Sequence, residues 1–268
     1  MNKILIVNDE IKNKKLDDSL NIIVHKKNEA FNVNTIDIII LKDTELEIRN
    51  DTTLEDTKLY LNFNIKDNVN AYIFDIRTGS KVKIQYNYNL GNESNLAVNK
   101  FYDCNKVREV DIINLDGFKA KIEHHLKTIS TNHEKYDIVI NHNNSSTVSY
   151  ISNNGINILD GQLVFNVTGY VPNGKKDCDI NQENRIITMN ENKCAINPNL
   201  LIDENDVSAS HSALIGKFND EEIFYLRSRG ISEKNAVNLL VKGLLLSKLS
   251  LTNKRKEELE NIIDKYWR

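Results

Sequence analysis

Residues 81–90 read KVKIQYNYNL, and polar and apolar side chains alternate along the whole stretch. The apolar positions are Val82, Ile84, Tyr86, Tyr88 and Leu90. Because successive residues of a strand point to opposite faces, this alternation predicts a β-strand with one buried face.

The same period continues on both sides of this stretch, from about residue 35 to residue 215. AYIFDIRTGS (71–80) and GQLVFNVTGYV (161–171) are examples, and Asn, Asp or Gly separates the runs. Short runs rich in β-branched and aromatic residues, broken every ~8–12 residues, are typical of an all-β protein. No convincing amphipathic helix interrupts the pattern.

Sandwich, barrel and β-solenoid all fit this spacing. Few of the breaks have the form of two-residue hairpin turns, and Asp116-Gly117 and Asp160-Gly161 are examples. Two prolines in the chain and many asparagines at the breaks favour stacked rungs of a solenoid, although no fixed repeat is present.

After Gly216 the period changes to that of helices. Asn219 with Glu222 can cap a first helix that ends at Gly230, and Ser232 and Thr252 can begin a second and a third.

We therefore expect a β-helix core over residues 1–216, whose start (1–35) is poorly defined, and a helical domain over 217–268. A solenoid exposes unpaired backbone groups at its ends. We expect the helices to cap the open end.

Composition limits the class of partner. The net charge is -3, with 40% hydrophobic and 27% charged residues, which argues against a nucleic-acid partner. No 18-residue apolar stretch is present, the first apolar run is too short for a signal peptide, and three cysteines without CxxC spacing do not suggest disulfides. We expect a cytoplasmic protein without membrane contact.

Residues 203–246, DENDVSASHSALIGKFNDEEIFYLRSRGISEKNAVNLLVKGLLL, resemble the C-terminal core of the SufB/SufD family of iron–sulfur cluster assembly scaffolds. The family pattern is a strand with a histidine, a short acidic link, a helix reading Phe-Tyr-Leu-x-Ser-Arg-Gly, and a second helix with an apolar-Gly-apolar segment. The positions in register are Phe224, Tyr225, Leu226, Ser228, Arg229, Gly230, Ala236, Leu240 and Gly243. The resemblance covers about residues 136–246 well.

The resemblance implies a right-handed parallel β-helix with a C-terminal helical cap that docks SufC, an ABC-type ATPase. It implies a scaffold subunit that is not itself an enzyme and binds no nucleotide, and the chain lacks a GxxxxGK[ST] loop. The expected partners are a SufC-like ATPase and a second β-helix, either another copy or a SufB/SufD paralogue. The residues expected to contact a partner are Phe224, Tyr225, Arg227, Arg229, Gly230 and Gly243, with Phe224 also packing on the end of the β-helix.

His211 falls on the histidine that SufB and SufD share, and a neutral imidazole can bind iron or a transient cluster. Its usual neighbours are absent, because Ala209, Ile186 and Ser212 occupy the positions of the family's two cysteines and its glutamate. Cys178 and Cys194 are therefore candidate replacement ligands. The alternatives are a hydrogen-bonded core or interface histidine and two small buried cysteines.

His124 and His125 are adjacent on an expected strand, so they point to opposite faces and cannot easily bind one ion. Cys104 has no motif around it and is expected to be structural.

Two other functions fit the fold: an interaction subunit without a metal site, and a carbohydrate-active β-helix enzyme. The enzyme would need a cluster of carboxylates and usually a signal peptide.

Overall fold

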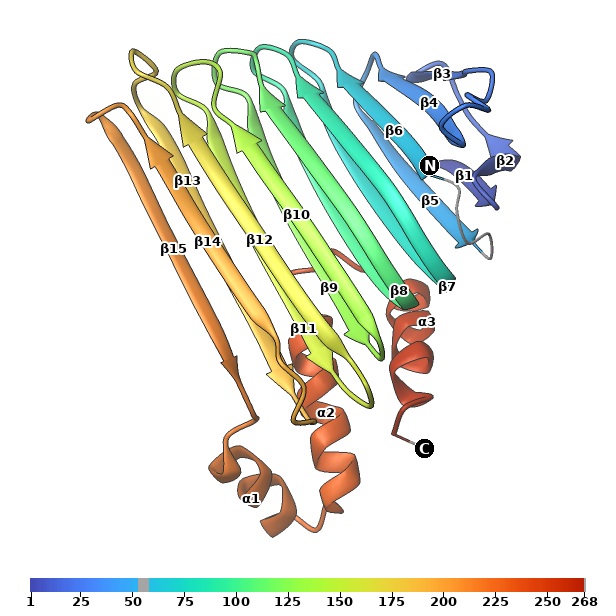
Figure 1. The fold of residues 1–268 in the computed structure, drawn as a ribbon, viewed down its shortest axis with the longest axis vertical. Helices are drawn as coiled ribbons and strands as arrows, with labels where there is room; N and C mark the ends of the chain where they lie inside the picture. Colours follow the sequence, from blue (N-terminus) through green and yellow to red (C-terminus); the bar gives the residue numbers. More distant parts are fainter. Residues whose placement is uncertain (53–57, 268) are drawn as a thin grey trace.

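The structure is a computed structural model that describes residues 1–52 and 58–267. Strands make up 58% of it and wind into a β-solenoid of about seven turns, followed by helices (Figure 1). The all-β class that the alternation predicts is confirmed, and so is the parallel β-helix that the family resemblance implies.

Two parallel sheets form the solenoid, and the chain passes from one to the other in every turn. Sheet 1 has the order β15-β13-β11-β9-β8-β7-β5-β1, and sheet 2 has the order β14-β12-β10-β8-β7-β6-β4. The long strands β7 (Asn70–Leu90) and β8 (Asn95–Leu115) run through both sheets. The other strands of the two sheets are β1 (Asn2–Val7), β4 (Val33–Ile40), β5 (Thr44–Thr52), β6 (Lys58–Ile65), β9 (Lys121–Ser130), β10 (His133–Asn141), β11 (Val148–Asn157), β12 (Gln162–Val171), β13 (Cys178–Thr188), β14 (Ala195–Ile202) and β15 (Val207–Gly216).

The N-terminal end, whose start the sequence leaves undefined, contains antiparallel strands. β2 (Glu10–Lys15) pairs with β1, and β3 (Leu20–Val24) pairs with β4. β2 and β3 each add an antiparallel edge strand to the first rungs. The last rung, in contrast, ends in the parallel strand β15.

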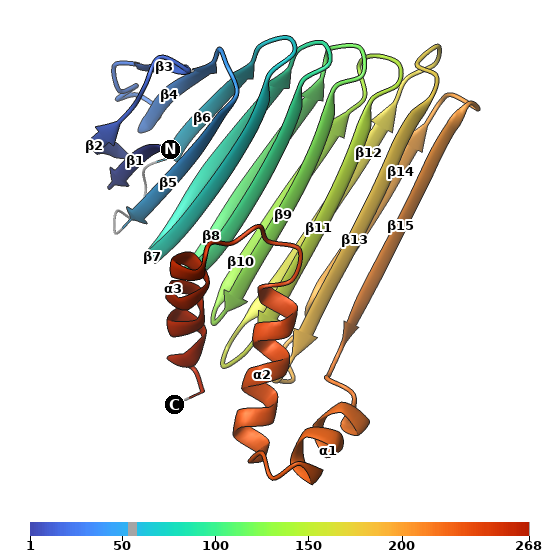
Figure 2. The ribbon, with the colours of Figure 1, turned by 180° about the vertical axis from the view of Figure 1, so that it is seen from behind.

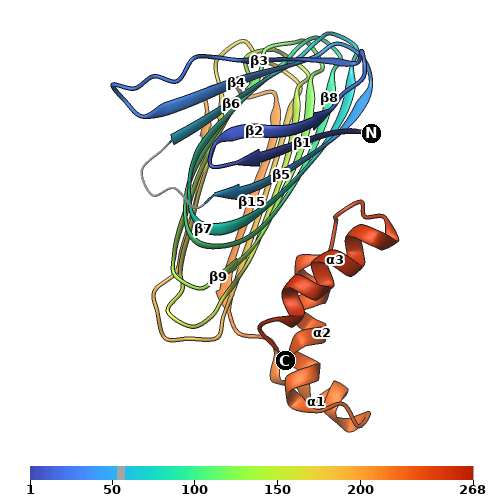
Figure 3. The same ribbon diagram turned by 90° about the vertical axis from the view of Figure 1, so that its right-hand side faces the viewer.

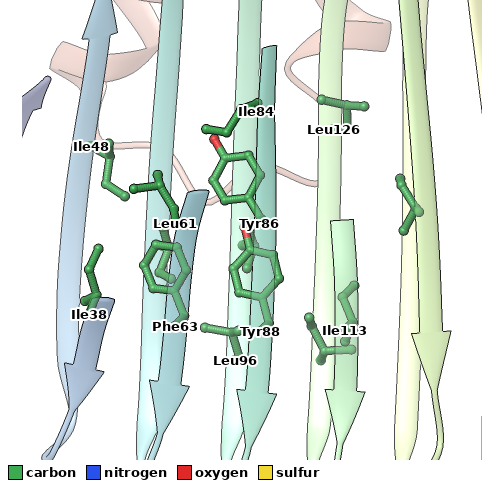
Figure 4. Packing of buried hydrophobic residues seen from close by; sticks show 14 of the residues in the cluster. Ile38, Ile48, Leu61, Phe63, Ile84, Tyr86, Tyr88, Leu96, Ile113 and Leu126 are labelled. Carbon is green, nitrogen blue, oxygen red and sulfur yellow. The ribbon is translucent and has the colours of Figure 1, made fainter. Parts of the chain in front are cut away.

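The core lies between the two sheets. All five apolar positions of KVKIQYNYNL are at most 3% exposed. The rings of Phe63 and Tyr88 stack with centroids 5.1 Å apart, and those of Tyr86 and Tyr88 stack at 5.7 Å (Figure 4). Aromatic side chains on adjacent rungs therefore help to hold the turns in register.

Asparagines form a ladder along the outer face of sheet 2. The side-chain amide of Asn89 donates to the Oδ1 of Asn64 (3.1 Å), that of Asn114 to Asn89 (2.8 Å), and that of Asn141 to Asn114 (2.8 Å). The many asparagines thus serve rung-to-rung hydrogen bonds as well as the turns.

The helices begin at the caps expected from the sequence. They are α1 (Asp220–Ser228), α2 (Glu233–Leu245) and α3 (Asn253–Asp264). The side chains of Asn219, Ser232 and Thr252 each accept a hydrogen bond from a backbone N–H of the first turn. Gly230 follows α1 with φ +82°, a left-handed conformation that glycine adopts without strain.

The C-terminal helical segment is present as predicted, and it lies along the side of the solenoid and leaves the last rung uncovered. α2 and α3 lie along the outer face of sheet 1 (Figures 2 and 3), where they share a second core with its strands. The core residues of the sheet are Phe74, Ile76, Phe101, Ile129, Ile156 and Ile187, and those of the helices are Val241, Leu245, Leu259, Ile262 and Ile263. The helices thus bury their apolar side chains on this face and not on the last rung.

Ion pairs fasten the helical segment at both ends of the solenoid. On α3, Arg255 contacts Glu47 (2.9 Å), and Glu258 forms a bidentate pair with Arg49 of β5. Beyond α2, Lys248 contacts Tyr150 of β11 and Glu183 of β13. The segment therefore links the first rungs to the last ones.

Candidate partner surface and metal ligands at the open end

The last strand of sheet 1 presents an open rung. Among the strands that the structure describes, β15 pairs only with β13, and eight of its ten residues are exposed. Its inward-facing row is Val207, Ala209, His211, Ala213 and Ile215, in register with Cys178, Ile180, Gln182, Asn184 and Ile186, which are buried. The row is exposed because no further rung follows.

His211 lies in this row beside Gln182. The Gln182 side chain is fully buried; its Nε2 donates to the Asn199 carbonyl (3.3 Å), and its Oε1 lacks a partner among the described residues. An exposed imidazole next to an unsatisfied buried amide gives the open rung a polar centre within an apolar row. The histidine is therefore a surface residue of the single chain and not a core residue.

The structure does not bring the two candidate cysteines to His211. Cys178 is paired with Val207, four residues before His211, which corresponds to about 13 Å along a strand. Cys194 precedes β14 in the other sheet; it is half-buried, and desolvation raises its pKa. A single ion needs ligand atoms within about 2.0–2.3 Å, so Cys178 and His211 of one chain cannot share it.

Cys178 itself sits in a closed environment. It is 1% exposed, and its Sγ lies 3.3 Å from the Thr147 hydroxyl and 3.4 Å from the carbonyl oxygens of Asn144 and Lys175. The thiol is therefore satisfied by neutral oxygen atoms, as expected of a small core residue.

In residues 1–52 and 58–267, no group of three or more His, Cys, Asp or Glu side chains could hold a metal ion. His124 and His125 point to opposite faces, as the strand period predicts. His124 contacts Asp111 inside the solenoid (2.9 Å), while His125 lies edge-on to Tyr150 outside it. Burial lowers the pKa of His125 to about 3, so this imidazole is neutral. Cys104, expected to be structural, is buried.

The α1 helix presents aromatic side chains to solvent. Phe224 is 73% exposed and Tyr225 is 56% exposed, and α1 has no buried residue. The expectation that Phe224 packs on the end of the β-helix is wrong, because α1 projects beyond the sheets (Figure 3). Exposed aromatic residues grouped on one element are typical of a protein interface.

The other predicted contact residues surround this surface. Arg229 donates to the Tyr225 hydroxyl (2.8 Å) and its guanidinium lies over the Tyr225 ring, whereas Arg227 pairs with Glu233 (3.1 Å). Gly243 is open, since nothing lies within 4 Å of an added Cβ, and it is one turn from the exposed Leu239. A groove of ≈ 370 Å³ runs between α1 and α2, lined by Asn219, Glu221, Glu222, Tyr225, Leu226 and Leu240.

A charged cluster inside the solenoid was missed in the sequence. Lys100 is fully buried between Glu109 (2.8 Å) and Asp111 (2.7 Å), and Tyr102 donates to Glu109. Desolvation raises the pKa of Glu109 to about 7, with the charge of Lys100 opposing it. In the sequence, these charged residues fall on the inward-facing positions of the alternating pattern. That placement was the sequence signal from which the cluster could have been found.

The sequence profile described as "SUF system FeS cluster assembly, SufBD core domain" matches residues 25–244. The chain belongs to the SufB/SufD family. The SufBD profile thus extends well upstream of the segment that carries the resemblance and includes most of the solenoid together with α1 and α2.

Curated relatives of this SufBD chain agree. It is 33% identical over 113 residues to "Iron-sulfur cluster assembly protein SufD" of Bacillus subtilis, covering 42% of this chain and 26% of the relative. It is 48% identical over 44 residues to the Escherichia coli protein of the same name, covering 16% and 10%, and 53% identical over 45 residues to a SufBD family protein of Pyrococcus horikoshii, covering 17% and 10%. These matches span about a quarter or less of each relative's length.

No helix among the described residues is long and apolar enough to cross a bilayer.

Proposed function

We propose that this SufBD chain is a non-enzymatic scaffold subunit of a SUF-type assembly complex that docks a SufC-like ABC ATPase through α1 and α2. The observation that carries this proposal is the exposed surface of Phe224, Tyr225, Leu239 and Gly243. A scaffold subunit that is not itself an ATPase needs a partner to drive its rearrangement with ATP. The exposed surface lies on α1 and α2, which belong to the helical segment that is held against the solenoid.

We also propose that two β-helices pair through the open rung. β15 leaves one row of backbone N–H and C=O groups unpaired, and a second strand can satisfy them by extending sheet 1. The inward row, from Val207 to Ile215, would then become the interior of a joint between two chains. Pairing of this kind would bury His211 and supply partners to Gln182.

A nascent iron–sulfur cluster would be cargo at this joint. His211 is the described donor that the open rung places there, so the remaining ligands would have to come from the second chain. Neutral imidazole binds iron, and burial at the joint would favour the neutral form.

Docking is tested by co-purification with the SufC-like ATPase. Phe224→Ala should weaken the complex at least about 10-fold, because exposed aromatic anchors commonly carry more than 1.4 kcal/mol of binding free energy. Leu201→Ala, an exposed apolar residue on β14, is the matched control. Equal affinity of the wild-type chain and Phe224→Ala would refute docking through α1.

Pairing is tested by sedimentation with Ala209→Arg. Ala209 is exposed in the single chain, so the arginine leaves the fold intact but would bury a charge in the joint. The control is Asn13→Arg on β2, at the opposite end. An unchanged oligomeric state in Ala209→Arg, with the wild-type chain dimeric, would exclude the open rung as the joint.

An interaction subunit without a metal role is the second candidate, and the separation of Cys178 from His211 along the last two strands of sheet 1 favours it. Anaerobic reconstitution of the ATPase complex with iron and sulfide separates the two functions. Cluster absorbance that is lost in His211→Ala supports the cargo site, and absorbance that is absent in the wild type supports the interaction subunit.

A further inference from the structure

The outer face of sheet 2 carries a column of cations on consecutive rungs. Lys83 of β7, Arg108 of β8 and Lys135 of β10 are paired in register. On β6, Leu59 pairs with Ile84, so the preceding residue Lys58 lies opposite Lys83 and continues the column. A second column, two residues earlier along the strands, contains Lys81, Lys106 and His133. We refer to these two columns as the basic ladder.

The basic ladder is unfavourable for the fold by itself. Neighbouring strands lie about 4.8 Å apart, and like charges directly opposite one another on adjacent strands are destabilising. Elsewhere on the same face, neutral amide pairs such as Asn89–Asn114 join the rungs. The ladder is therefore a local departure from the arrangement that stabilises the rest of the sheet.

Within the part of the chain that the structure describes, three cations of the ladder, Lys83, Lys106 and Arg108, have no carboxylate partner. Lys58 bonds to Gln85 (3.2 Å) and Lys135 pairs with Asp137 (3.0 Å). Lys83, Lys106 and Arg108 are exposed, and no contact with a carboxylate is found for them in residues 1–52 and 58–267. An unfavourable arrangement without compensation in the fold is expected at a site of function.

A groove of ≈ 420 Å³ runs along the basic ladder. Its lining includes Lys81, Lys83, Lys106, Arg108, His133 and Lys135, with Val164 and Gln162 of β12 at one side. None of its described lining residues is aromatic, so nucleic-acid bases would find no stacking surface. The net charge of the chain is -3, so the positive charge of this groove is opposite in sign to that of the chain as a whole.

We propose that the basic ladder binds an acidic segment of a partner protein in an extended conformation. Alternate side chains of an extended peptide lie about 6.7 Å apart, which equals the two-residue separation between the columns. Two carboxylates, at positions i and i+2 of a peptide that runs parallel to the strands, would therefore meet the two columns. Exposed ion pairs are individually weak, so the complex should form quickly and depend strongly on salt. The inference is independent of ATPase docking, because the groove lies on the sheet that the helices leave uncovered.

Fluorescence anisotropy with fluorescein-labelled octaglutamate tests the proposal at low salt and at about 0.15 M salt. The triple variant Lys83→Gln, Lys106→Gln, Arg108→Gln should bind about 10-fold more weakly than the wild type. The control variant Lys66→Gln, Lys119→Gln, Lys121→Gln removes the same charge from exposed lysines outside the ladder and should bind within about 2-fold of the wild type.

The fold is checked in the same samples. The thermal midpoint of the triple variant should not fall, because the substitution removes like-charge repulsion; Arg108→Gln alone provides a milder version of the test. The proposal is overturned if the wild type does not bind octaglutamate at low salt or if both triple variants lose affinity equally. It is also overturned if a single-stranded DNA of equal charge binds more tightly through the same three residues.

Discussion

Lys127 gives a direct test of how the helical segment is packed. Its side chain is fully buried in the outer row of sheet 1, in register with Phe101 and Asn154, and its Nζ has no hydrogen-bond partner among the described residues. Desolvation lowers the pKa of Lys127 from 10.5 to about 7; repulsion from Lys248 adds to the effect and Glu183 opposes it.

The unfolded chain binds the Lys127 proton more tightly than the folded chain between pH 7 and pH 10.5. The contribution of Lys127 to the free energy of unfolding should therefore rise with pH across this window, and the cost of the buried amine is full below it. At 1.36 kcal/mol per pH unit, this cost is about 4 kcal/mol at pH 7 and about 1 kcal/mol at pH 10.

We expect Lys127→Met to be more stable than the wild type by roughly these amounts, since methionine has a similar length and no charge. Urea unfolding followed by far-UV circular dichroism measures the difference at both pH values. Lys121→Met, an exposed lysine on the same strand, should change stability by less than about 0.5 kcal/mol. A gain that does not shrink as the pH rises would refute the reasoning, and so would a loss of stability.

Three more results follow from buried or exposed groups. Desolvation raises the pKa of Glu134 to about 8, so the wild type should lose stability as the pH rises from 4.5 to 8; Glu134→Gln should be the more stable protein at about pH 9 and not at about pH 4, by urea unfolding. Arg255→Met removes one partner of the buried Glu47, which keeps Arg49, and should cost about 2–3 kcal/mol and speed proteolysis of α3. Phe224→Ala should leave the thermal midpoint unchanged, since the ring is 73% exposed.

Alternation was sufficient to predict the strands, because a period of two depends only on which face of each strand is buried. KVKIQYNYNL shows this: every apolar residue points into the core. The helix caps at Asn219, Ser232 and Thr252 are equally local and were found for the same reason.

The location of the helices could not be read from local pattern. Their position depends on Phe74, Ile76 and Phe101, which make the outer face of sheet 1 apolar as well. The run Tyr-Ile-Phe at 72–74 has no alternation and is the signal that both faces of this strand are buried.

The sequence was sufficient to predict which residues belong to the candidate site, but not how exposed they are or which residues surround them. The alternation places His211 on the inward row, yet its exposure follows from β15 being the last rung, which is a property of the whole stack. The separation of Cys178 from His211 follows from register, since a pairing partner cannot be deduced from the spacing of residues along the chain.

The route of the helical segment has a consequence for synthesis. The solenoid can form rung by rung as the chain leaves the ribosome, but the outer face of sheet 1 waits for residues near the C-terminus. About 160 residues separate Phe101 from Ile263, which is about 8–30 s of translation at 5–20 residues per second. During that time the row of Phe74, Ile76 and Phe101 is open to water, so the nascent chain should depend on a holding chaperone until α3 emerges.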